Sequence, residues 1–257
     1  MNPAVIVSFV LACAFSVQAH PSSRIVNGLE AGVGQFPIQV FLDLTNIRNE
    51  KSRCGGALLS DSWVLTAAHC FDDLKSMVVS VGAHDISKSE EPHRQTRKPE
   101  RYFQHEKYDK ANLAYDLGLL KLDKPVELND FVKLTKLNKD KTETFVGKTA
   151  TVSGWGISKD FPAFELPDKL QYTTLEVQPS EDCKKVWGPY MRDYILCAKF
   201  EKQNICTGDS GGPLTIDGVQ VGVVSFGSVP CARGNPSGFT NVAHFVDWIQ
   251  EHTGLEL

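Results

Sequence analysis

The segment Val219-Gln220-Val221-Gly222-Val223-Val224-Ser225-Phe226 lies between the turn residues Asp217-Gly218 and Gly227. A short run rich in valine, bounded in this way, is typical of a β-strand. Similar runs recur along the chain, separated by glycine, proline and other turn residues. They are Pro37–Leu42, Met77–Val81, Leu117–Leu122 and Ala150–Ser153. Many short strands of this kind predict an all-β barrel or sandwich.

The last part of the chain has a helical period instead. Its apolar positions are Val242, Phe245, Val246 and Ile249, which fall at i, i+3, i+4 and i+7. With Asn241 as a cap and Gly254 just past the end, this spacing predicts a C-terminal amphipathic helix. A second, weaker helix is expected to start at Ser180, because Glu181 and Asp182 favour its positive end.

Length and charge narrow the class of protein. A chain of 257 residues suffices for one large all-β domain or two small ones. A net charge of −4 gives no broad basic field, so nucleic acid is not an expected partner. The densest basic stretch, Lys133–Lys141, fits a solvated loop better than a polyanion site. The wider polar stretch Lys133–Lys148 is a candidate linker between two halves of similar size.

The first residues have the pattern of a targeting segment. Val5–Val17 is apolar but too short to span a bilayer, and Val17-Gln18-Ala19 suits signal peptidase. We therefore expect a signal peptide over residues 1–19 and a secreted protein; the alternative is a buried N-terminal strand. No later segment reaches about eighteen apolar residues, so no membrane anchor is expected.

Cysteine usage agrees with an oxidising compartment. Cys13 lies in the expected signal peptide, which leaves six cysteines and predicts three disulfides among fifteen possible pairings. The six are Cys54, Cys70, Cys183, Cys197, Cys206 and Cys231. No Cys-x-x-Cys pair suggests a zinc site, and no cofactor or metal is expected.

Three motifs carry residue types suited to nucleophilic catalysis. They are Leu65–Cys70 around His69, Asp116–Leu122 at the start of an apolar run, and Gly208–Pro213 around Ser210. The third also fits Gly-x-Ser-x-Gly, the nucleophile elbow of α/β-hydrolases, for which Asp217 and His244 would complete a triad. That alternative fails because Gly211-Gly212-Pro213 is a poor helix start and the chain lacks βαβ alternation.

The order His, Asp, Ser with these flanking residues resembles the chymotrypsin-like (trypsin-fold) serine proteases, from Ile25 to the end of the chain. The motifs are Ile25–Gly28, Cys54–Gly56, Thr66–Cys70, Asp116–Leu120, Gly154–Gly156, Gly208–Pro213 and Val224–Gly227. The resemblance implies two six-stranded antiparallel β-barrels packed face to face, at about 25–135 and 136–257, followed by the C-terminal amphipathic helix. It also implies the disulfides Cys54–Cys70, Cys183–Cys197 and Cys206–Cys231.

The same resemblance implies a secreted serine endopeptidase. Ser210 would attack the peptide carbonyl, His69 would act as general base and then acid, and Asp116 would orient the imidazole. The backbone N–H groups of Gly208 and Ser210 would form the oxyanion hole. Ser225 would support the aspartate. The alternative of another class is a catalytically silent homologue that acts as a binding protein; such proteins typically lose a triad residue, and this chain has all three.

The resemblance further implies synthesis as a zymogen. Residues 20–24 would be an activation propeptide, cleaved after Arg24, and the new ammonium of Ile25 would insert beside Asp209.

By the same resemblance, Asn204 would lie at the base of the primary specificity pocket, where trypsin-like members have an acid. The remaining substrate-binding positions would be Ile205, Ser225, Phe226, Gly227 and Ser237. A pocket without a counter-ion disfavours Arg and Lys. We expect cleavage after Leu, Phe, Tyr or Met, with elastase-like or collagenolytic specificity, as in similar arthropod enzymes, as the alternative.

Several expectations about partners follow. The substrates would be proteins or peptides, and a neutral pocket would not recognise Arg24, so a separate trypsin-like protease would activate the precursor. Protein protease inhibitors are possible partners, a monomer is expected, and the gut lumen is a candidate location. The family's calcium loop would lie near 82–91, where Ala83 replaces the first expected carboxylate, so a solvated loop is favoured over a calcium site.

Overall fold

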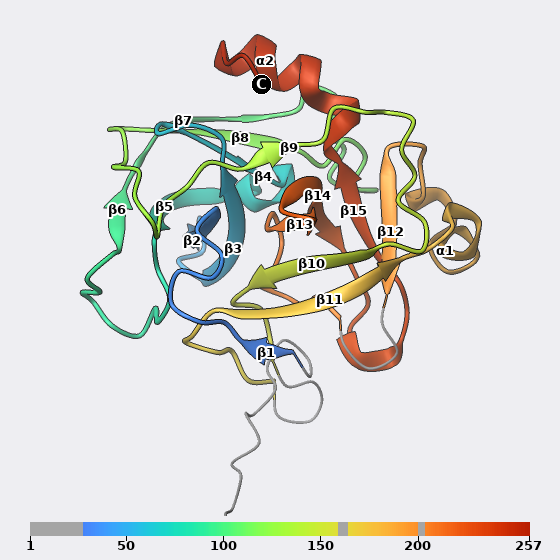
Figure 1. The fold of residues 1–257 in the computed structure, drawn as a ribbon, viewed down its shortest axis with the longest axis horizontal. Coiled ribbons are helices and arrows are strands. Elements are labelled where there is room, and N and C mark those ends of the chain that lie inside the picture. Colours follow the sequence, from blue (N-terminus) through green and yellow to red (C-terminus); the bar gives the residue numbers. More distant parts are fainter. Residues whose placement is uncertain (1–27, 159–163, 200–203) are drawn as a thin grey trace, which may run out of the picture.

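The computed structural model describes residues 28–158, 164–199 and 204–257. Two antiparallel β-sheets lie side by side, the first built from the N-terminal half of the chain and the second from the C-terminal half (Figure 1). The strands are β1 (Leu29–Glu30), β2 (Gln39–Asn46), β3 (Lys51–Leu58), β4 (Trp63–Thr66), β5 (Leu74–Val81), β6 (Gln95–Arg97), β7 (Pro99–Gln104), β8 (Gly118–Leu122), β9 (Lys136–Leu137), β10 (Thr149–Gly154), β11 (Gln171–Val177), β12 (Ile195–Lys199), β13 (Pro213–Ile216), β14 (Val219–Phe226) and β15 (Ser237–Asn241). The helices are α1 (Ser180–Trp187) and α2 (Val246–Thr253), with short 3-10 turns η1 (Ala68–Phe71), η2 (Gly188–Tyr190), η3 (Cys231–Arg233) and η4 (Val242–Phe245).

The first sheet closes into a barrel through one interrupted strand. Its order is β6-β5-β2-β3-β4-β8-β7. The two ends, β6 and β7, are consecutive in the chain and are separated by Lys98 alone, so residues 95–104 pair with β5 on one side and β8 on the other. Counted in this way the barrel has six antiparallel strands, as predicted.

The second sheet is a closed ring. β11 pairs with both β10 and β12, which joins the two ends of the path β11-β10-β13-β14-β15-β12. These six strands are antiparallel. Two short strands lie outside the ring: β1 pairs with β11, and β9 pairs with β14 in parallel. Through β1 and β9, segments from the N-terminal side of the chain attach to the second barrel.

Each barrel encloses its own apolar core. The first is filled mainly by Leu, Val and aromatic side chains from β2 to β8, and the second by a smaller cluster around Phe239. The C-terminal helix does not pack on the second barrel's core. Instead Trp248 and Ile249 of α2, and Phe245 just before it, belong to the cluster of the first barrel. The helix therefore ties the end of the chain back to its beginning.

Predicted elements and observed ones agree closely. β14 has the bounds expected from its sequence, and α1 begins at Ser180. The C-terminal helix starts with a 3-10 turn in which Asn241 Oδ1 accepts the N–H of Ala243, and it ends at Gly254, whose φ of 70° is left-handed. Glycine adopts that conformation readily.

Three disulfides join the pairs that the resemblance implied. Their Cα–Cα distances are 6.3 Å for Cys54–Cys70, 6.3 Å for Cys183–Cys197 and 5.6 Å for Cys206–Cys231. The first lies beside the cleft between the barrels, where it holds β3 to η1.

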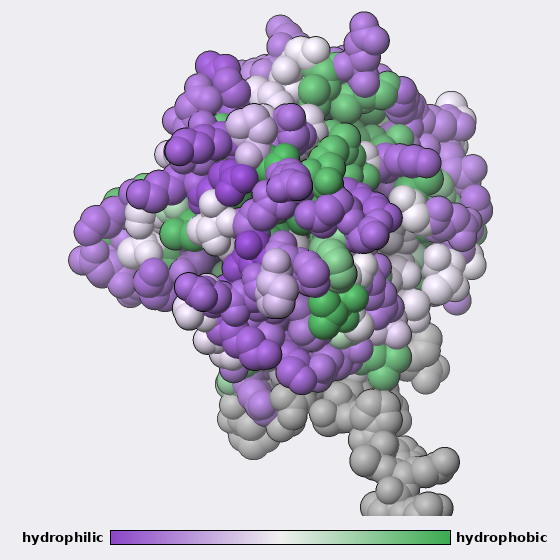
Figure 2. Space-filling view, turned by 60° about the vertical axis from the view of Figure 1, so that its left-hand side comes forward, coloured by the Kyte–Doolittle hydropathy of each residue, from purple (hydrophilic) through white to green (hydrophobic). Residues whose placement is uncertain are grey.

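Among the described residues, no helix combines the length and the apolar character needed to cross a bilayer. The face shown in Figure 2 is mainly hydrophilic, with apolar residues in small groups between polar ones. That pattern is ordinary for a surface in contact with water.

Candidate active site

His69 and Asp116 come from neighbouring strands of the first barrel. His69 lies in η1, directly after β4, and Asp116 lies directly before β8. β4 and β8 pair with Thr66 opposite Gly118, so the two side chains start from adjacent strand ends. Asp116 Oδ2 lies 2.8 Å from His69 Nδ1, and Asp116 Oδ1 accepts the backbone N–H of His69 at 2.9 Å.

The carboxylate of Asp116 is wholly buried and well supplied with donors. Besides the two bonds from His69, Ser225 Oγ donates to its Oδ2 at 2.6 Å from the second barrel. An ionised carboxylate only accepts hydrogen bonds, so its neighbour His69 Nδ1 carries the proton. The other ring nitrogen, Nε2, is then left with a free lone pair, as a general base requires.

Several charges act on the His69 imidazole, whose side chain is 22% exposed. Burial lowers its pKa, but the charge of Asp116, the hydrogen bond to Asp116 and the charge of Asp72 outweigh burial and raise the pKa overall. Asp72 is held in turn by Tyr108, whose hydroxyl donates to it at 2.9 Å, and by Gln104 Nε2 at 3.2 Å.

Our sequence reasoning missed Asp72, Gln104 and Tyr108. A signal for Asp72 was available, because it stands three residues after His69. For Gln104 and Tyr108 the sequence offered no sign, since they reach Asp72 from a separate segment.

Ser210 belongs to the second barrel. The close approach of Gly55 and Gly212 places it next to the first barrel. The N–H of Gly55 donates to the carbonyl of Ser210 at 2.7 Å. A Cβ on Gly55 would lie 2.9 Å from the Cα of Gly212, so any larger residue would separate the two strands. Glycine at this position permits the contact between the barrels.

His69 and Ser210 line one cavity of about 160 Å³, together with Gly208 and the Cys54–Cys70 disulfide. Within the described ranges no hydrogen bond is recorded between the imidazole and the Ser210 hydroxyl. Such bonds are commonly long in the absence of substrate and tighten when it binds. The imidazole of His69 and the hydroxyl-bearing side chain of Ser210 therefore belong to the walls of the same cavity.

The backbone around Ser210 requires glycine for a second reason. Gly208 has φ of +106°, and a Cβ there would lie 2.9 Å from the Cα of Gly156. A residue with a side chain would be strained in this conformation. Gly208 and Ser210 both line the cavity that contains His69, so the absence of a side chain at 208 leaves that part of the cavity open.

A second cavity, of about 220 Å³, adjoins Ser210. Among the residues that the structure describes, its lining is largely apolar or small and contains no carboxylate. The lining residues are Ile205, Cys206, Thr207, Ser210, Val224, Ser225, Phe226, Gly227, Ser228, Val229 and Cys231.

Asn204 and Ser237 lie behind this cavity rather than in its lining. Both are buried, and Ser237 Oγ donates to Asn204 Oδ1 at 2.8 Å. Asn204 also donates through Nδ2 to the carbonyl of Asn235 at 2.8 Å and accepts the N–H of Ile205 at 2.9 Å. The amide of Asn204 therefore bonds to protein groups on all these sides, whereas the next residue, Ile205, lines the cavity.

Asp209 is buried directly beside the nucleophile. Its two carboxylate oxygens accept the N–H groups of Gly156 at 2.8 Å and Cys206 at 2.9 Å. Among the described residues no cation contacts it, and burial raises its pKa to about 6. Arg24 and Ile25, which the resemblance links to activation, lie outside the described residues, as do the expected signal peptide and propeptide.

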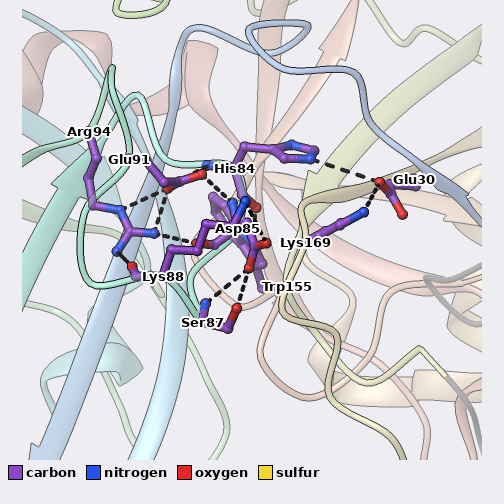
Figure 3. A network of polar contacts seen from close by, with 9 residues as sticks. All are labelled: Glu30, His84, Asp85, Ser87, Lys88, Glu91, Arg94, Trp155 and Lys169. Carbon is purple, nitrogen blue, oxygen red and sulfur yellow. Dashed lines mark hydrogen bonds and ion pairs between the residues drawn. The ribbon is translucent and has the colours of Figure 1, made fainter.

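The loop that the resemblance links to calcium is filled by an arginine (Figure 3). Arg94 donates to the carboxylate of Glu91 at 2.5 and 2.9 Å and to the carbonyls of Asp85 and Lys88 at 2.8 Å each. Glu91 in turn accepts the N–H of Asp85 at 2.6 Å. The oxygen atoms that a calcium ion would need already accept bonds from the guanidinium, so these residues do not fit the ion.

A cluster of Cys54, His69 and Cys70 also has the spacing of metal ligands. The two sulfurs are joined in a disulfide, and a metal requires a thiolate. This cluster belongs to the cleft and does not hold a metal.

Fold and site together define a class: two closed six-stranded barrels with a His-Asp pair on one and a serine flanked by glycines on the other. The trypsin family model matches residues 25–249, and the chain belongs to that family of serine endopeptidases. It is 35% identical to chymotrypsin of Phaedon cochleariae over 92% of this chain and 84% of the relative. It is 34% identical to brachyurin of Leptuca pugilator over 90% and 99%. The solved structure of HL collagenase superposes with a TM-score of 0.83 at 34% identity, covering 91% of this chain and all of the other.

Proposed function

We propose that Ser210, His69 and Asp116 hydrolyse peptide bonds by acyl transfer. Ser210 Oγ attacks the carbonyl carbon while His69 Nε2 takes its proton, and the N–H groups of Gly208 and Ser210 bind the oxyanion. His69 then protonates the leaving amine, and a water molecule hydrolyses the acyl-enzyme. The observation that carries this proposal is the buried Asp116 carboxylate, which accepts His69 Nδ1 at 2.8 Å.

An organophosphonate probe tests this assignment directly. The activated wild type should be labelled at Ser210, whereas Ser210→Ala and His69→Ala should not. Thr215→Val is a matched control, because Thr215 lies in β13 of the same barrel and its hydroxyl bonds to the carbonyl of Thr151. Labelling at another serine would contradict the proposal.

We infer that cleavage follows a neutral apolar residue. The described residues that line the cavity beside Ser210 include no carboxylate, and an Arg or Lys side chain there would lose its hydration without a counter-ion. Ile205 contributes a large apolar side chain to this lining and should limit the depth of the pocket. Leu and Met therefore fit best, with Phe and Tyr entering less deeply.

A panel of peptide amides varied at the residue before the cut tests this specificity. Substrates with Leu or Met before the cut should have the highest kcat/KM. Ile205→Ala should raise kcat/KM for Phe and Tyr relative to Leu by roughly 10-fold. Val229→Ala is the matched control, because Val229 is exposed at the rim and does not limit depth. A preference for Arg or Lys would overturn the inference.

Collagen is a second candidate for the natural substrate. The similarity to HL collagenase extends over 91% of this chain, which favours it over a general elastase-like role. Incubation of the activated enzyme with native triple-helical collagen at 25 °C tests this activity. Cleavage of heat-denatured collagen alone would exclude it.

We propose that the enzyme is made as a secreted precursor, with a signal peptide over residues 1–19 and a propeptide over 20–24. Cleavage after Arg24 would free the ammonium of Ile25, and Asp209 is a buried carboxylate that such a cation would neutralise. A neutral pocket does not recognise Arg24, so a separate trypsin-like protease would make the cut. Pure precursor incubated alone should remain inactive, whereas added trypsin should activate it.

Secretion into an extracellular space, such as a gut lumen, agrees with three disulfides. We propose a monomer that acts on proteins and is controlled by protein inhibitors that occupy the cleft. Size-exclusion chromatography with light scattering tests the first point, and titration with a general inhibitor of trypsin-family enzymes tests the second.

A further inference from the structure

The segment immediately before Asp116 has an unusual backbone. Leu113 and Tyr115 have φ of 53° and 52°, in the left-handed region that residues with side chains rarely adopt. Two such residues just before a functional aspartate imply that surrounding contacts hold the segment in place.

Those contacts come from the second barrel. Arg192 donates to the carbonyl of Asn112 at 3.3 Å and to its Oδ1 at 2.8 Å. Tyr194 acts at the other end of the segment, where its hydroxyl accepts the N–H of Tyr115 at 3.2 Å. Arg192 and Tyr194 are two residues apart in the chain. They form hydrogen bonds with the two ends of the segment 112–115.

Tyr194 is itself firmly placed. Its carbonyl accepts the N–H of Asn241 at 2.8 Å, next to β15. Its ring lies 4.8 Å from that of Tyr115 and 5.4 Å from that of Phe245. A third contact from the second barrel acts on Asp116, because Thr240 Oγ1 donates to its carbonyl at 2.9 Å.

The position of the Asp116 carboxylate depends on this backbone. The peptide that links Tyr115 to Asp116 sets where the carboxylate begins, and His69 Nδ1 lies only 2.8 Å from its Oδ2. A shift of the segment would lengthen that bond, turn the imidazole and weaken the charge effect that raises the His69 pKa.

We propose that Arg192 and Tyr194 are positioning residues that hold Asn112–Tyr115, and with it Asp116, against His69. This inference rests on the proposed role of Asp116. It means that the relative placement of the two barrels controls catalysis twice: by bringing Ser210 to His69 and by aligning Asp116 behind it.

Tyr194→Phe tests the proposal, because it removes only the hydroxyl. In the activated enzyme, kcat for a Leu-amide substrate should fall by about 10-fold, since small misplacements reduce rates steeply, while KM stays unchanged. The acidic limb of the kcat/KM profile should move to lower pH, because His69 feels less of the Asp116 charge. Arg192→Lys should have the same two effects, and it provides the test if Tyr194→Phe fails to fold.

Two controls separate the possible outcomes. Tyr172→Phe removes a hydroxyl from β11, where the tyrosine ring packs against Phe36 at 5.2 Å, and should match the wild type. Asp116→Asn should reduce kcat by roughly 10⁴-fold; if it remains fully active, the proposed triad fails. If Asp116→Asn shows this large loss while Tyr194→Phe and Arg192→Lys keep the wild-type rate and pH profile, only the positioning proposal fails. A rate loss with an unchanged profile, in step with a lower Tm, would also overturn it.

Discussion

At the scale of single residues, His69 shows how one partner sets both geometry and protonation. Burial alone would lower its pKa, yet the pKa is raised because Asp116 contributes a charge and a hydrogen bond. A general base works only when neutral, so activity should increase as the pH rises through this pKa.

Asp116→Asn should reduce kcat by roughly 10⁴-fold, because an amide no longer enforces the tautomer with its proton on Nδ1. The residual activity should have its acidic limb at lower pH than the wild type, since the charge that raises the His69 pKa is gone. Rate measurements from pH 5 to 9 check this. A limb at unchanged or higher pH would mean that Asp116 does not govern the protonation of His69.

Asp209 gives a second residue-scale prediction, which concerns stability. Burial raises its pKa from 3.8 to about 6, so the folded state favours the protonated form. The stabilising contribution is complete below pH 4 and is lost between about pH 4 and pH 6, a total of about 3 kcal/mol. Urea unfolding of the Ser210→Ala protein at pH 5 and pH 8 should reveal the second half of this loss, about 1.4 kcal/mol.

The Asp209→Asn precursor, in the same Ser210→Ala background, is the control for that measurement. It should lack the pH-dependent loss of stability that Asp209 causes. After cleavage at Arg24, the paired ammonium should also remove it. A precursor whose stability is the same at both values of pH would contradict the raised pKa of Asp209.

At the scale of elements, the loop between β5 and β6 depends on the largely buried pair Arg94 and Glu91, whose side chains are 11% and 10% exposed. Arg94→Gln leaves the Glu91 carboxylate unpaired and should destabilise the protein by about 3–5 kcal/mol. Thermal unfolding of the Ser210→Ala background measures this effect. Lys88→Gln in the same loop is the matched control, because Lys88 is exposed and should change stability little.

The same loop predicts indifference to calcium. Since the guanidinium of Arg94 takes the oxygen acceptors, neither calcium nor a chelator should shift the Tm of the wild type. A rise in Tm with calcium would contradict our reading of the loop.

The sequence was sufficient for the elements with a strong local pattern. β14 is a valine-rich run with turn residues at both ends. Asn241 and Gly254 mark the limits of the C-terminal helical segment. The placement of Tyr194, Arg192 and Thr240 could not be predicted, because each acts on a partner more than 75 residues away through contacts that only the packed barrels create. Asn204 was expected at the base of a pocket, but its hydrogen bonds to Ser237 and Asn235 turn it inward.

At the scale of the whole molecule, the C-terminal helix should make the two barrels unfold together. Ile249 is fully buried in the core cluster of the first barrel. Ile249→Ala should therefore cost about 2–5 kcal/mol and lower the single Tm of the Ser210→Ala protein by several degrees. Calorimetry checks this; two separate transitions would show that the barrels are independent. Val186→Ala, at an exposed site on α1, should leave the Tm nearly unchanged.

The packing of the C-terminal helix in the core of the first barrel also has a consequence for folding during synthesis. The N-terminal half emerges from the ribosome first, but part of its interior is supplied by Phe245, Trp248 and Ile249, within the last thirteen residues. Residues still in the ribosomal tunnel cannot fill that gap, so the core of the first barrel stays incomplete until these three residues have left the tunnel. A nascent chain stalled before Phe245 should consequently be far more sensitive to added protease than the released, full-length chain.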